Sequence, residues 1–410
     1  MRILQLCTKV PYPPLDGGAA GVYFFSNALS SLGHQVDILA VNPPKHFIDE
    51  QVYKDLPSAI HIYPVVMDTT PRWYSALKNL FFTHYPYLVE RFINEQFTKR
   101  LGELIELNNP DIVQIEGIYL CPYIPFIRTH TTSTVVLRAH NVEHILWSDI
   151  AHNQKNIFKK VYLKIQTSRL KKYEVMQLTK VDGVTTVTEN DLQILKRNSP
   201  ALTANVVPFG ISLPTNIYNK KPNLKTLYFL GALDWIPNQE ALNWFVKIVW
   251  PRIIEAFPDF EFHVAGRNAP QGFITFLKDK RGVIFHGEIP EALAFIEPYT
   301  FNVVPLFSGS GIRVKIIESM AYGKVVIGSS KAVSGIPAVN GKHILLAETA
   351  DDYLNHIKNL ISNPGLIKEI SDNAMVLVRE RFNILAITSD LINFYRKIII
   401  TPDRMTRASD

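Results

Sequence analysis

The sequence predicts an α/β protein with two doubly wound, parallel-sheet domains that face each other across a cleft. Three observations support this prediction. The chain has 410 residues, which is more than one ordinary hydrophobic core accommodates. Short apolar runs bounded by turn residues alternate with longer helical patterns, as in parallel sheets joined by crossover helices. A polar segment at 213–224, rich in Pro, Asn and Lys, interrupts the alternation and predicts a linker.

The predicted strands are the short apolar runs that precede the helical patterns. In the first half they cover residues 2–7, 35–40, 60–65, 111–115, 134–138, 183–187 and 205–207. In the second half they cover 226–230, 261–265, 283–285, 301–304, 325–328 and 344–346. We therefore expect an N-terminal domain over 1–212 and a C-terminal domain over 225–383. A last long helix at about 384–399 is expected to return, with the rest of 384–410, to the N-terminal domain.

The composition is that of a globular protein, with 47% apolar and 20% charged residues. The start of the chain lacks the apolar core and cleavage site of a signal peptide, and no apolar stretch is long enough to span a membrane. We therefore expect a cytoplasmic protein. Cys7 and Cys121 lie in apolar strand-like runs without metal-ligand spacing, which predicts reduced, structural thiols.

A basic segment at 155–180 contributes much of the net charge of +6. Its only acid is Glu174, and apolar residues recur at helical spacing, which predicts an amphipathic helix. Its basic residues are Lys155, Lys159, Lys160, Lys164, Arg169, Lys171, Lys172 and Lys180. The segment is either a solvated helix face or a contact for an anionic membrane or a lipid-diphosphate acceptor. Nucleic acid is not expected as a partner, because no nucleic-acid-binding module accompanies the charge.

The clearest motif is PLFSGSGIRVKIIESMAYGKVVI at 305–327, a strand end, a glycine loop, a helix and the next strand. Gly309 and Gly311 let the backbone approach an anion, and the positive end of the helix faces that anion. Arg313 and Lys315 add two charges where cations are unfavourable for the helix itself, so a diphosphate is the expected ligand. Glu318 is expected to accept hydrogen bonds from a ribose, or alternatively to pair with Lys315 or Arg313.

Other strand ends of the first half carry polar side chains. Gly17 and Gly18 follow the first strand and are expected to bind the donor. Glu116 ends the strand DIVQIEG, where it could orient an acceptor or lie on the surface. His140 follows the strand VVLRA and is either a functional or a capping histidine. With Glu143 and His144 it could also suggest a metal site, but the H-E-x-x-H arrangement is missing and no metal is expected.

The pattern G-S-G-I-R-V-K-I-I-E-S-M-A resembles the donor-binding loop and helix of the family 4 retaining glycosyltransferases, which have the GT-B fold of two Rossmann-like domains. It is similar to a subgroup with G-x-G-x-R-x-K-x-x-E-A-M-A. Many members of the family place a Glu where this chain has Ser310. The contact that this Glu makes to the sugar must here come from Ser310 or from loop amides. The segments 9–41, 135–147 and 230–245 extend the resemblance along the chain.

The resemblance implies roles for further residues. It implies that His140 reaches the donor sugar from the acceptor side. It also implies that Gly266 with Arg267, and His286 with Gly287, lie in loops that line the nucleotide base. Many relatives place an Arg and a Lys near the start of the second domain; this chain has Asp234, Trp235 and Asn238, so we assign the diphosphate to Arg313 and Lys315.

We expect, on this resemblance, a retaining, metal-independent hexosyltransferase that uses a nucleotide diphosphate sugar and needs no other cofactor. Its acceptor is a glycan or a lipid-linked sugar, and its pathway is cell-surface polysaccharide synthesis. A GT-B epimerase and a catalytically idle nucleotide-sugar-binding protein remain alternatives. An NAD-dependent oxidoreductase is not expected, because TKVPYPPLDGGAAG replaces the G-x-G-x-x-G that should follow the first strand.

Overall fold

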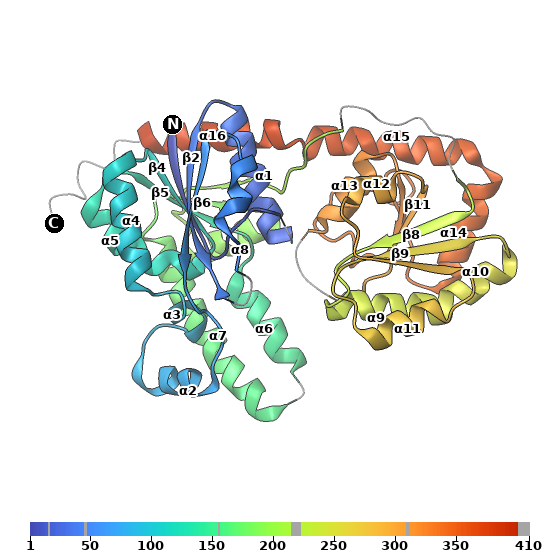
Figure 1. The fold of residues 1–410 in the computed structure, drawn as a ribbon, viewed down its shortest axis with the longest axis horizontal. Helices are drawn as coiled ribbons and strands as arrows, with labels where there is room; N and C mark the ends of the chain where they lie inside the picture. The colour runs from blue at the N-terminus through green and yellow to red at the C-terminus, as the bar shows by residue number, and fades with distance from the viewer. Residues whose placement is uncertain (15–16, 45–46, 155, 215–222, 309–311, 401–410) are drawn as a thin grey trace. The chain divides into compact units, whose positions relative to one another are not determined.

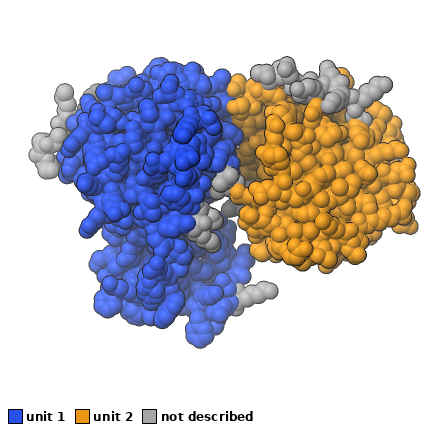
Figure 2. Space-filling view, viewed as in Figure 1, with its two compact units in different colours: residues 1–210, 384–410 blue, residues 211–383 orange. Residues whose placement is uncertain are grey.

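The computed structural model describes residues 1–14, 17–44, 47–154, 156–214, 223–308 and 312–400. It separates into two compact units (Figure 2). Unit 1 comprises residues 1–210 and 384–410, and unit 2 comprises residues 211–383. Most of the predicted linker at 213–224 lies outside the described residues, as do Lys155 and the glycine loop with Gly309, Ser310 and Gly311.

The described residues of unit 1 form a seven-stranded parallel sheet in the order β3-β2-β1-β4-β5-β6-β7 (Figure 1). Side chains along β1 alternate between two buried clusters, with Leu4 and Leu6 on one face and Ile3 and Cys7 on the other. The strand order reverses between β1 and β4, and ligands of open α/β sheets bind beyond the strand ends at such a reversal. The strands are β1 (Arg2–Cys7), β2 (Gln35–Asn42), β3 (Ile60–Val66), β4 (Ile112–Glu116), β5 (Thr134–Ala139), β6 (Gly183–Thr186) and β7 (Ala204–Val206).

Helices cover both faces of this sheet. The last helix of the chain, α16, lies beside α1 (Figure 1), and its Leu391 and Tyr395 are buried in the same cluster as Phe25 of α1. Unit 1 is therefore completed by a segment that follows unit 2 in sequence. The helices are α1 (Gly17–Ser31), α2 (Trp73–Phe82), α3 (Tyr87–Glu90), α4 (Glu95–Asn108), α5 (Ile124–His130), α6 (Glu143–Asn153), α7 (Ile157–Leu178), α8 (Glu189–Asn198) and α16 (Ile384–Ile400), with short 3₁₀ turns at Glu50–Asp55 and Ile118–Tyr123.

Unit 2 repeats this architecture with a six-stranded parallel sheet among its described residues, in the order β10-β9-β8-β11-β12-β13. Leu227 and Phe229 of β8 enter the cluster on one face, and Tyr228 enters the cluster on the other. The strand order reverses between β8 and β11, so these two strand ends form the second ligand-binding position. The strands are β8 (Thr226–Leu230), β9 (Glu261–Ala265), β10 (Val283–Gly287), β11 (Phe301–Val304), β12 (Val325–Gly328) and β13 (Leu345–Leu346).

The helices of unit 2 include α13, which follows the predicted anion-binding loop. Gly323, with φ of 67°, follows α13 and turns the chain toward β12 in a conformation that glycine adopts without strain. The helices are α9 (Ile236–Trp244), α10 (Trp250–Ala256), α11 (Gln271–Lys278), α12 (Ala292–Ile296), α13 (Val314–Ala321), α14 (Ala350–Ser362) and α15 (Pro364–Arg381), with a π turn at Phe245–Val249 between α9 and α10.

The predicted α/β architecture is confirmed, and every predicted strand is present with ends within about two residues of those expected, the usual uncertainty of such boundaries. Cys7 and Cys121 are buried, unpaired thiols. No helix formed by the described residues is both long enough and apolar enough to cross a membrane.

Candidate active site

Arg313 stands at the strand-order reversal of unit 2, immediately before α13. Its guanidinium carbon lies 5.1 Å from the centroid of the Trp235 ring, a cation–π contact. Trp235 is the residue before α9, at the end of the chain segment that follows β8, and Arg313 follows β11. These two strands are neighbours in the sheet, so the contact holds Arg313 over their carboxyl edge.

Lys315 and Glu318 lie one turn apart on α13, and each counters the pKa shift that burial causes in the other. Burial lowers the pKa of Lys315, and Arg267 lowers it further, while Glu318 counters both effects. Burial raises the pKa of Glu318, and Lys315 counters this rise. Lys315 nevertheless remains exposed by surface area, so protein surrounds its ammonium group without closing it off from solvent.

Arg267 follows β9 after one residue, Gly266, and is close enough to Lys315 to lower its pKa. Arg267, Arg313 and Lys315 thus lie on either side of the end of β8, with Glu318 on α13 as the carboxylate that acts on Lys315. Burial lowers the pKa of Arg313 as well, which means that the surrounding protein disfavours its charge. The backbone N–H groups at the start of α13 add positive partial charge. This edge of unit 2 is therefore suited to a multiply charged anion.

Gly266 has a packing role that its sequence context did not reveal. A Cβ atom at this position would lie 1.8 Å from the backbone oxygen of Gly231, so only glycine allows the loops after β8 and β9 to touch. Asn238 is also engaged locally, since its amide donates to the Ala232 oxygen at 2.8 Å. Gly266 thus shapes the cation site by bringing two backbone segments together.

His286 lies at the end of β10 and faces neighbouring aromatic side chains. Its Nε2 lies 3.0 Å from Nδ1 of His263, and the second ring nitrogen of His263 lies 3.2 Å from a carboxylate oxygen of Glu261. Burial lowers the pKa of His286, so the two imidazoles share one hydrogen bond with little tendency to charge. The predicted base-binding role of His286 stays a prediction.

In unit 1, the structure brings His140 and Glu116 together beyond the ends of β5 and β4. Nε2 of His140 lies 2.6 Å from Oε2 of Glu116, whose side chain is 2% exposed, while the His140 side chain is 20% exposed. Burial alone would raise the pKa of Glu116, but Arg138 and hydrogen bonds from His140 and Gln114 outweigh it and lower the pKa. Since a carboxylate only accepts hydrogen bonds, Nε2 of His140 is the donor in this contact, and Nδ1 is the ring nitrogen that can accept a hydrogen bond.

Arg138 is the cation that keeps Glu116 ionised. It pairs with Glu116 across neighbouring strands, with Nη1 3.9 Å from Oε1, and it is completely buried. Its guanidinium carbon lies 3.8 Å from the centroid of the Phe25 ring, and its nitrogens have no hydrogen-bond partner among the described residues. Glu116 is thus its one close countercharge in this part of the chain.

A chain of hydrogen bonds links this pair to the last helix. The Tyr395 hydroxyl of α16 donates to Oε1 of Gln114, and the Gln114 amide donates to Oε1 of Glu116. All of these groups are buried. The position of His140 therefore depends on α16, which reaches unit 1 only after the chain has passed through unit 2.

Glu143 and His144 do not join His140 in a shared centre. Nδ1 of His144 lies 2.5 Å from the carboxylate of Glu174, which also accepts from the backbone N–H of Glu143 at 3.0 Å. The Glu143 carboxylate accepts from the Tyr119 hydroxyl at 2.5 Å. Across the described ranges, no group of three His, Cys, Asp or Glu side chains is arranged to hold a metal ion.

Gly17 and Gly18 form the exposed first turn of α1, just beyond β1 at the strand-order reversal. Gly21, one turn on, faces Phe209, because a Cβ atom there would lie 2.2 Å from the Phe209 ring. The Phe209 ring in turn lies 6.2 Å from the His140 ring, centroid to centroid. The first turn of α1, Phe209 and His140 thus lie at the same edge of unit 1.

Two residues of these sites were not singled out from the sequence: Arg138 and Phe209. Arg267 was expected with Gly266 in a loop at a strand end, and its effect on Lys315 adds it to the cations of this site. Arg138 occupies a strand interior, where a charge is unusual, but its partner Glu116 is visible only from the register of β4 and β5. Nothing in the sequence pairs Phe209 with Gly21.

Two family models match successive parts of this chain. Residues 15–213 match the model described as Glycosyltransferase Family 4, and residues 224–363 match the model described as Glycosyl transferases group 1. The chain is also 23% identical to a Klebsiella pneumoniae protein described as an uncharacterized 44.6 kDa protein in the cps region, over 93% of this chain and 96% of that protein.

Solved structures share the whole two-unit fold. Sucrose-phosphate synthase from Thermosynechococcus elongatus matches with a TM-score of 0.69 and 18% identity, over 97% of this chain and 99% of that one. Anabaena HepE in complex with UDP-glucose matches with a TM-score of 0.64 and 13% identity, over 97% of this chain and 100% of that one. These similarities concern the fold.

Proposed function

We propose, from the premise that this chain belongs to the glycosyltransferases of the family 4 type and has the GT-B fold, that it moves a hexose-type sugar from a nucleotide diphosphate donor to a glycan or lipid-linked acceptor. The sugar keeps its anomeric configuration in this proposal. The product belongs to a cell-surface polysaccharide, which is in line with the cps region named for the Klebsiella relative. The proposed place of the reaction is the cytoplasm.

The single observation that carries the proposal is the group of three cations at the ends of β9 and β11. The group consists of Arg267, Arg313 and Lys315. Burial lowers the pKa of Arg313 and of Lys315, so their charged forms are disfavoured while no ligand is bound. A diphosphate bridging these side chains would restore the favourable environment of their charged forms. The same contacts strengthen as the nucleoside diphosphate departs and its terminal oxygen gains charge.

The proposed reaction needs no bound metal, because the three cations supply the positive charge that stabilises the leaving diphosphate. One preorganised donor to a developing oxyanion is worth about 3 to 4 kcal/mol. Glu318 is proposed to accept hydrogen bonds from the ribose hydroxyls. Burial raises its pKa, and hydrogen bonds from the ribose hydroxyls to the carboxylate would offset that cost.

On the acceptor side we assign His140 to contact with the substrates and Glu116 to its positioning. The side chain of Glu116 is 2% exposed, so it orients an acceptor through His140 rather than by direct contact. His140 would present Nδ1 toward an acceptor hydroxyl or a donor sugar. A retaining reaction without a carboxylate nucleophile leaves the departing phosphate to take the acceptor proton, with His140 holding the acceptor in place.

Transfer assays with the purified chain test the proposal. UDP-, GDP- and TDP-sugars would be offered with glycan and lipid-linked acceptors, and transfer, epimerisation and hydrolysis measured separately. Arg313→Ala is expected to lower transfer about a hundredfold or more, because one donor to the leaving group is lost. Arg379→Ala, an exposed arginine of α15, serves as the matched control and should leave the rate unchanged.

Near-normal transfer by Arg313→Ala would remove the assigned role of the cation group. Epimerised donor without any transferred sugar would identify an epimerase, and tight donor binding without turnover would identify an idle binding protein. Glu318→Gln adds a second test: calorimetry should show weaker nucleotide binding with a smaller effect on the rate of the chemical step. Unchanged nucleotide affinity would contradict the ribose contact.

A further inference from the structure

Helix α2 presents its apolar side to solvent. Trp73, Leu77 and Phe81 follow one another at intervals of four residues, and they are 80%, 51% and 72% exposed. Phe82 on the neighbouring row is 78% exposed. The residue of α2 that is buried is the polar Asn79. This reverses the usual order of a surface helix, which hides its apolar face and exposes its polar one.

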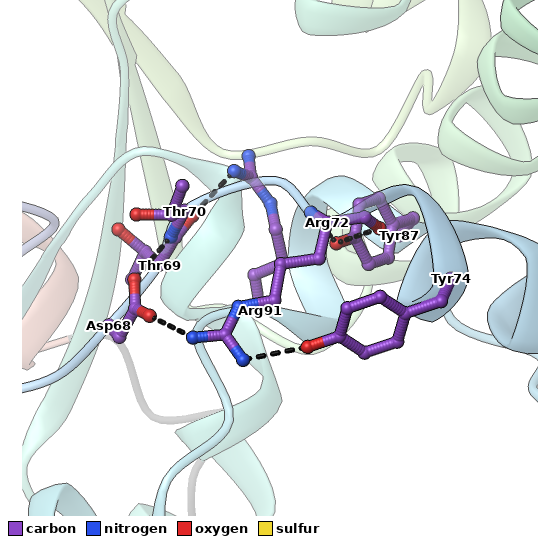
Figure 3. Close-up of polar contacts among 7 residues, drawn as sticks. All are labelled: Asp68, Thr69, Thr70, Arg72, Tyr74, Tyr87 and Arg91. Carbon is purple, nitrogen blue, oxygen red and sulfur yellow. Dashed lines mark hydrogen bonds and ion pairs between the residues drawn. The ribbon is translucent and has the colours of Figure 1, made fainter.

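Polar contacts hold the beginning of α2 in this orientation (Figure 3). The Tyr87 hydroxyl accepts from the backbone N–H of Arg72 at 2.8 Å and donates to the Arg72 oxygen at 3.1 Å. The Arg72 guanidinium bonds Asp68 at 2.6 Å and the Tyr74 hydroxyl at 2.7 Å. Arg91 donates to the Thr69 oxygen at 2.7 Å, which fixes the preceding loop.

The end of α2 is fixed by α7 in the same way. Arg169 donates to the Leu80 oxygen at 2.7 Å, a carbonyl that the end of a helix leaves open, and also to the Asn79 oxygen at 3.2 Å. The Gln166 amide donates to the Asn79 side chain at 3.0 Å. Hydrogen bonds therefore hold both ends of α2 to the rest of unit 1, so the fold itself sets the orientation that exposes the apolar face of α2.

The first turns of α7 continue the pattern. Ile157, Phe158 and Val161 are 62%, 83% and 51% exposed. Figure 1 shows the α6–α7 pair and α2 together at the same end of unit 1, and the bonds from Arg169 and Gln166 join them. We name the exposed apolar residues of α2 and of the first turns of α7 the aromatic surface; its members are Trp73, Leu77, Phe81, Phe82, Ile157, Phe158 and Val161.

The charge around the aromatic surface is positive. Lys78 of α2 and Lys159 and Lys164 of α7 are exposed beside it. Of the acids nearby, Asp68 is paired with Arg72 and Glu174 is buried against the start of α6, while Asp149 of α6 is exposed; the lysines outnumber it. Exposed aromatic and aliphatic side chains flanked by lysines are the composition that binds the headgroup region of an anionic bilayer.

We propose that the aromatic surface docks unit 1 onto an anionic lipid bilayer, with the apolar side chains inserted at the level of the headgroups and the lysines against lipid phosphates. Lysines around the surface favour this occupant over a second copy of the chain, because two identical positive surfaces repel each other. Apolar side chains that project from two helices held by hydrogen bonds can insert a short way into the headgroup region of a bilayer. The proposal does not depend on the transferase activity.

Binding of the full chain to lipid vesicles tests the proposal. Vesicles of phosphatidylcholine alone and of phosphatidylcholine with phosphatidylglycerol would be sedimented with the protein. We expect binding to the anionic vesicles and loss of binding at high salt, which screens the lysines. Trp73 emission should shift to shorter wavelength on binding, and Trp73→Phe should keep binding but lose most of that shift.

Two sets of substitutions identify the surface. Phe81→Ser with Phe82→Ser should weaken vesicle binding at least about tenfold, because apolar area no longer leaves water. Lys159→Gln should weaken it about fivefold, the effect of one cation near an anionic surface. Leu107→Ala and Lys99→Gln are matched controls on α4, where the side chain of Leu107 is 76% exposed, and they should bind as the unaltered chain does.

Three results would overturn the proposal. One is the absence of binding to anionic vesicles by the unaltered chain. Another is an equal loss of binding in the control variants. The third is a concentration-dependent dimer in sedimentation velocity that Phe81→Ser/Phe82→Ser dissolves while vesicles are ignored; this would assign the surface to self-association. All substituted residues are exposed, so circular dichroism should show folded variants in every arm.

Discussion

Replacing Glu116 with Gln is expected to destabilise unit 1 by more than any single hydrogen bond accounts for. Arg138 is completely buried, its nitrogens have no hydrogen-bond partner among the described residues, and the Glu116 carboxylate lies 3.9 Å away. The substitution keeps the size of the side chain and removes its charge, and it replaces one acceptor oxygen by an amide nitrogen that cannot accept from Gln114 or His140. Arg138 is then left as a buried cation whose remaining close partner is the face of the Phe25 ring.

The magnitude follows from this distance. Two unit charges about 4 Å apart attract by about 4 kcal/mol at an effective dielectric constant of about 20. Measured losses on breaking a buried ion pair by removing one partner are about 3 to 5 kcal/mol. We therefore expect Glu116→Gln to lower the free energy of unfolding of unit 1 by about 3 to 4 kcal/mol. The double variant Glu116→Gln/Arg138→Met should recover most of this loss, because no buried charge remains unpaired.

The dependence on pH has a definite sign. The pKa of Glu116 is lowered in the folded protein, so its contribution to stability is present above the pKa of unfolded glutamate. This contribution is lost as the pH falls through the lowered, folded-state pKa. The unaltered chain and the Glu116→Gln variant should therefore differ in stability near neutral pH and converge in acid.

Chemical denaturation followed by hydrogen exchange of peptides from β4 and β5 measures unit 1 separately from unit 2. A loss below about 1 kcal/mol for Glu116→Gln would refute the reasoning, since the buried cation would then have another counterpart. A double variant as unstable as the single one would refute it as well. Gln35→Glu, a conservative change at an exposed strand position, controls for the procedure.

Two further predictions concern unit 2. Gly266→Ala should destabilise unit 2 by about 3 kcal/mol or more, because the new Cβ atom would lie 1.8 Å from the Gly231 oxygen. The control Gly272→Ala, whose Cβ meets nothing within 4 Å, should be neutral or stabilising. Thermal denaturation measures both, and equal melting temperatures for the two variants would contradict the close approach. Nucleoside diphosphate binding should weaken as the pH rises through the lowered pKa of Lys315, and binding near that pH should be coupled to proton uptake. Calorimetry in buffers of different ionisation enthalpy measures this uptake. A Lys315→Gln variant with the same pH profile would contradict the assignment.

The sequence predicted the strands well because burial on both faces makes them continuous apolar runs. β1, β8, β9, β11 and β12 have the expected bounds, since turn residues bracket them closely. The last helix was also expected, and it packs against α1 of unit 1. These features are local in sequence, or depend only on the alternation of strands and helices.

Features that depend on register or on distant packing were not predictable. Glu116 faces Arg138 because β4 and β5 pair in a particular register, and Tyr395 reaches Gln114 only through the return of α16. The apolar stripe of α2 would normally indicate a buried helix face. That it is exposed follows from the bonds of Arg169 and Tyr87, which no sequence pattern reveals.

The central claim is that the cations at the ends of β9 and β11 hold the diphosphate of the donor. A crystal structure of the chain with a nucleoside diphosphate tests it most directly. The account predicts both phosphates within hydrogen-bond reach of Arg313 and Lys315, with Arg267 beside them and a ribose hydroxyl on Glu318. Phosphates bound at any other part of the chain, with these side chains contacting no ligand, would contradict it.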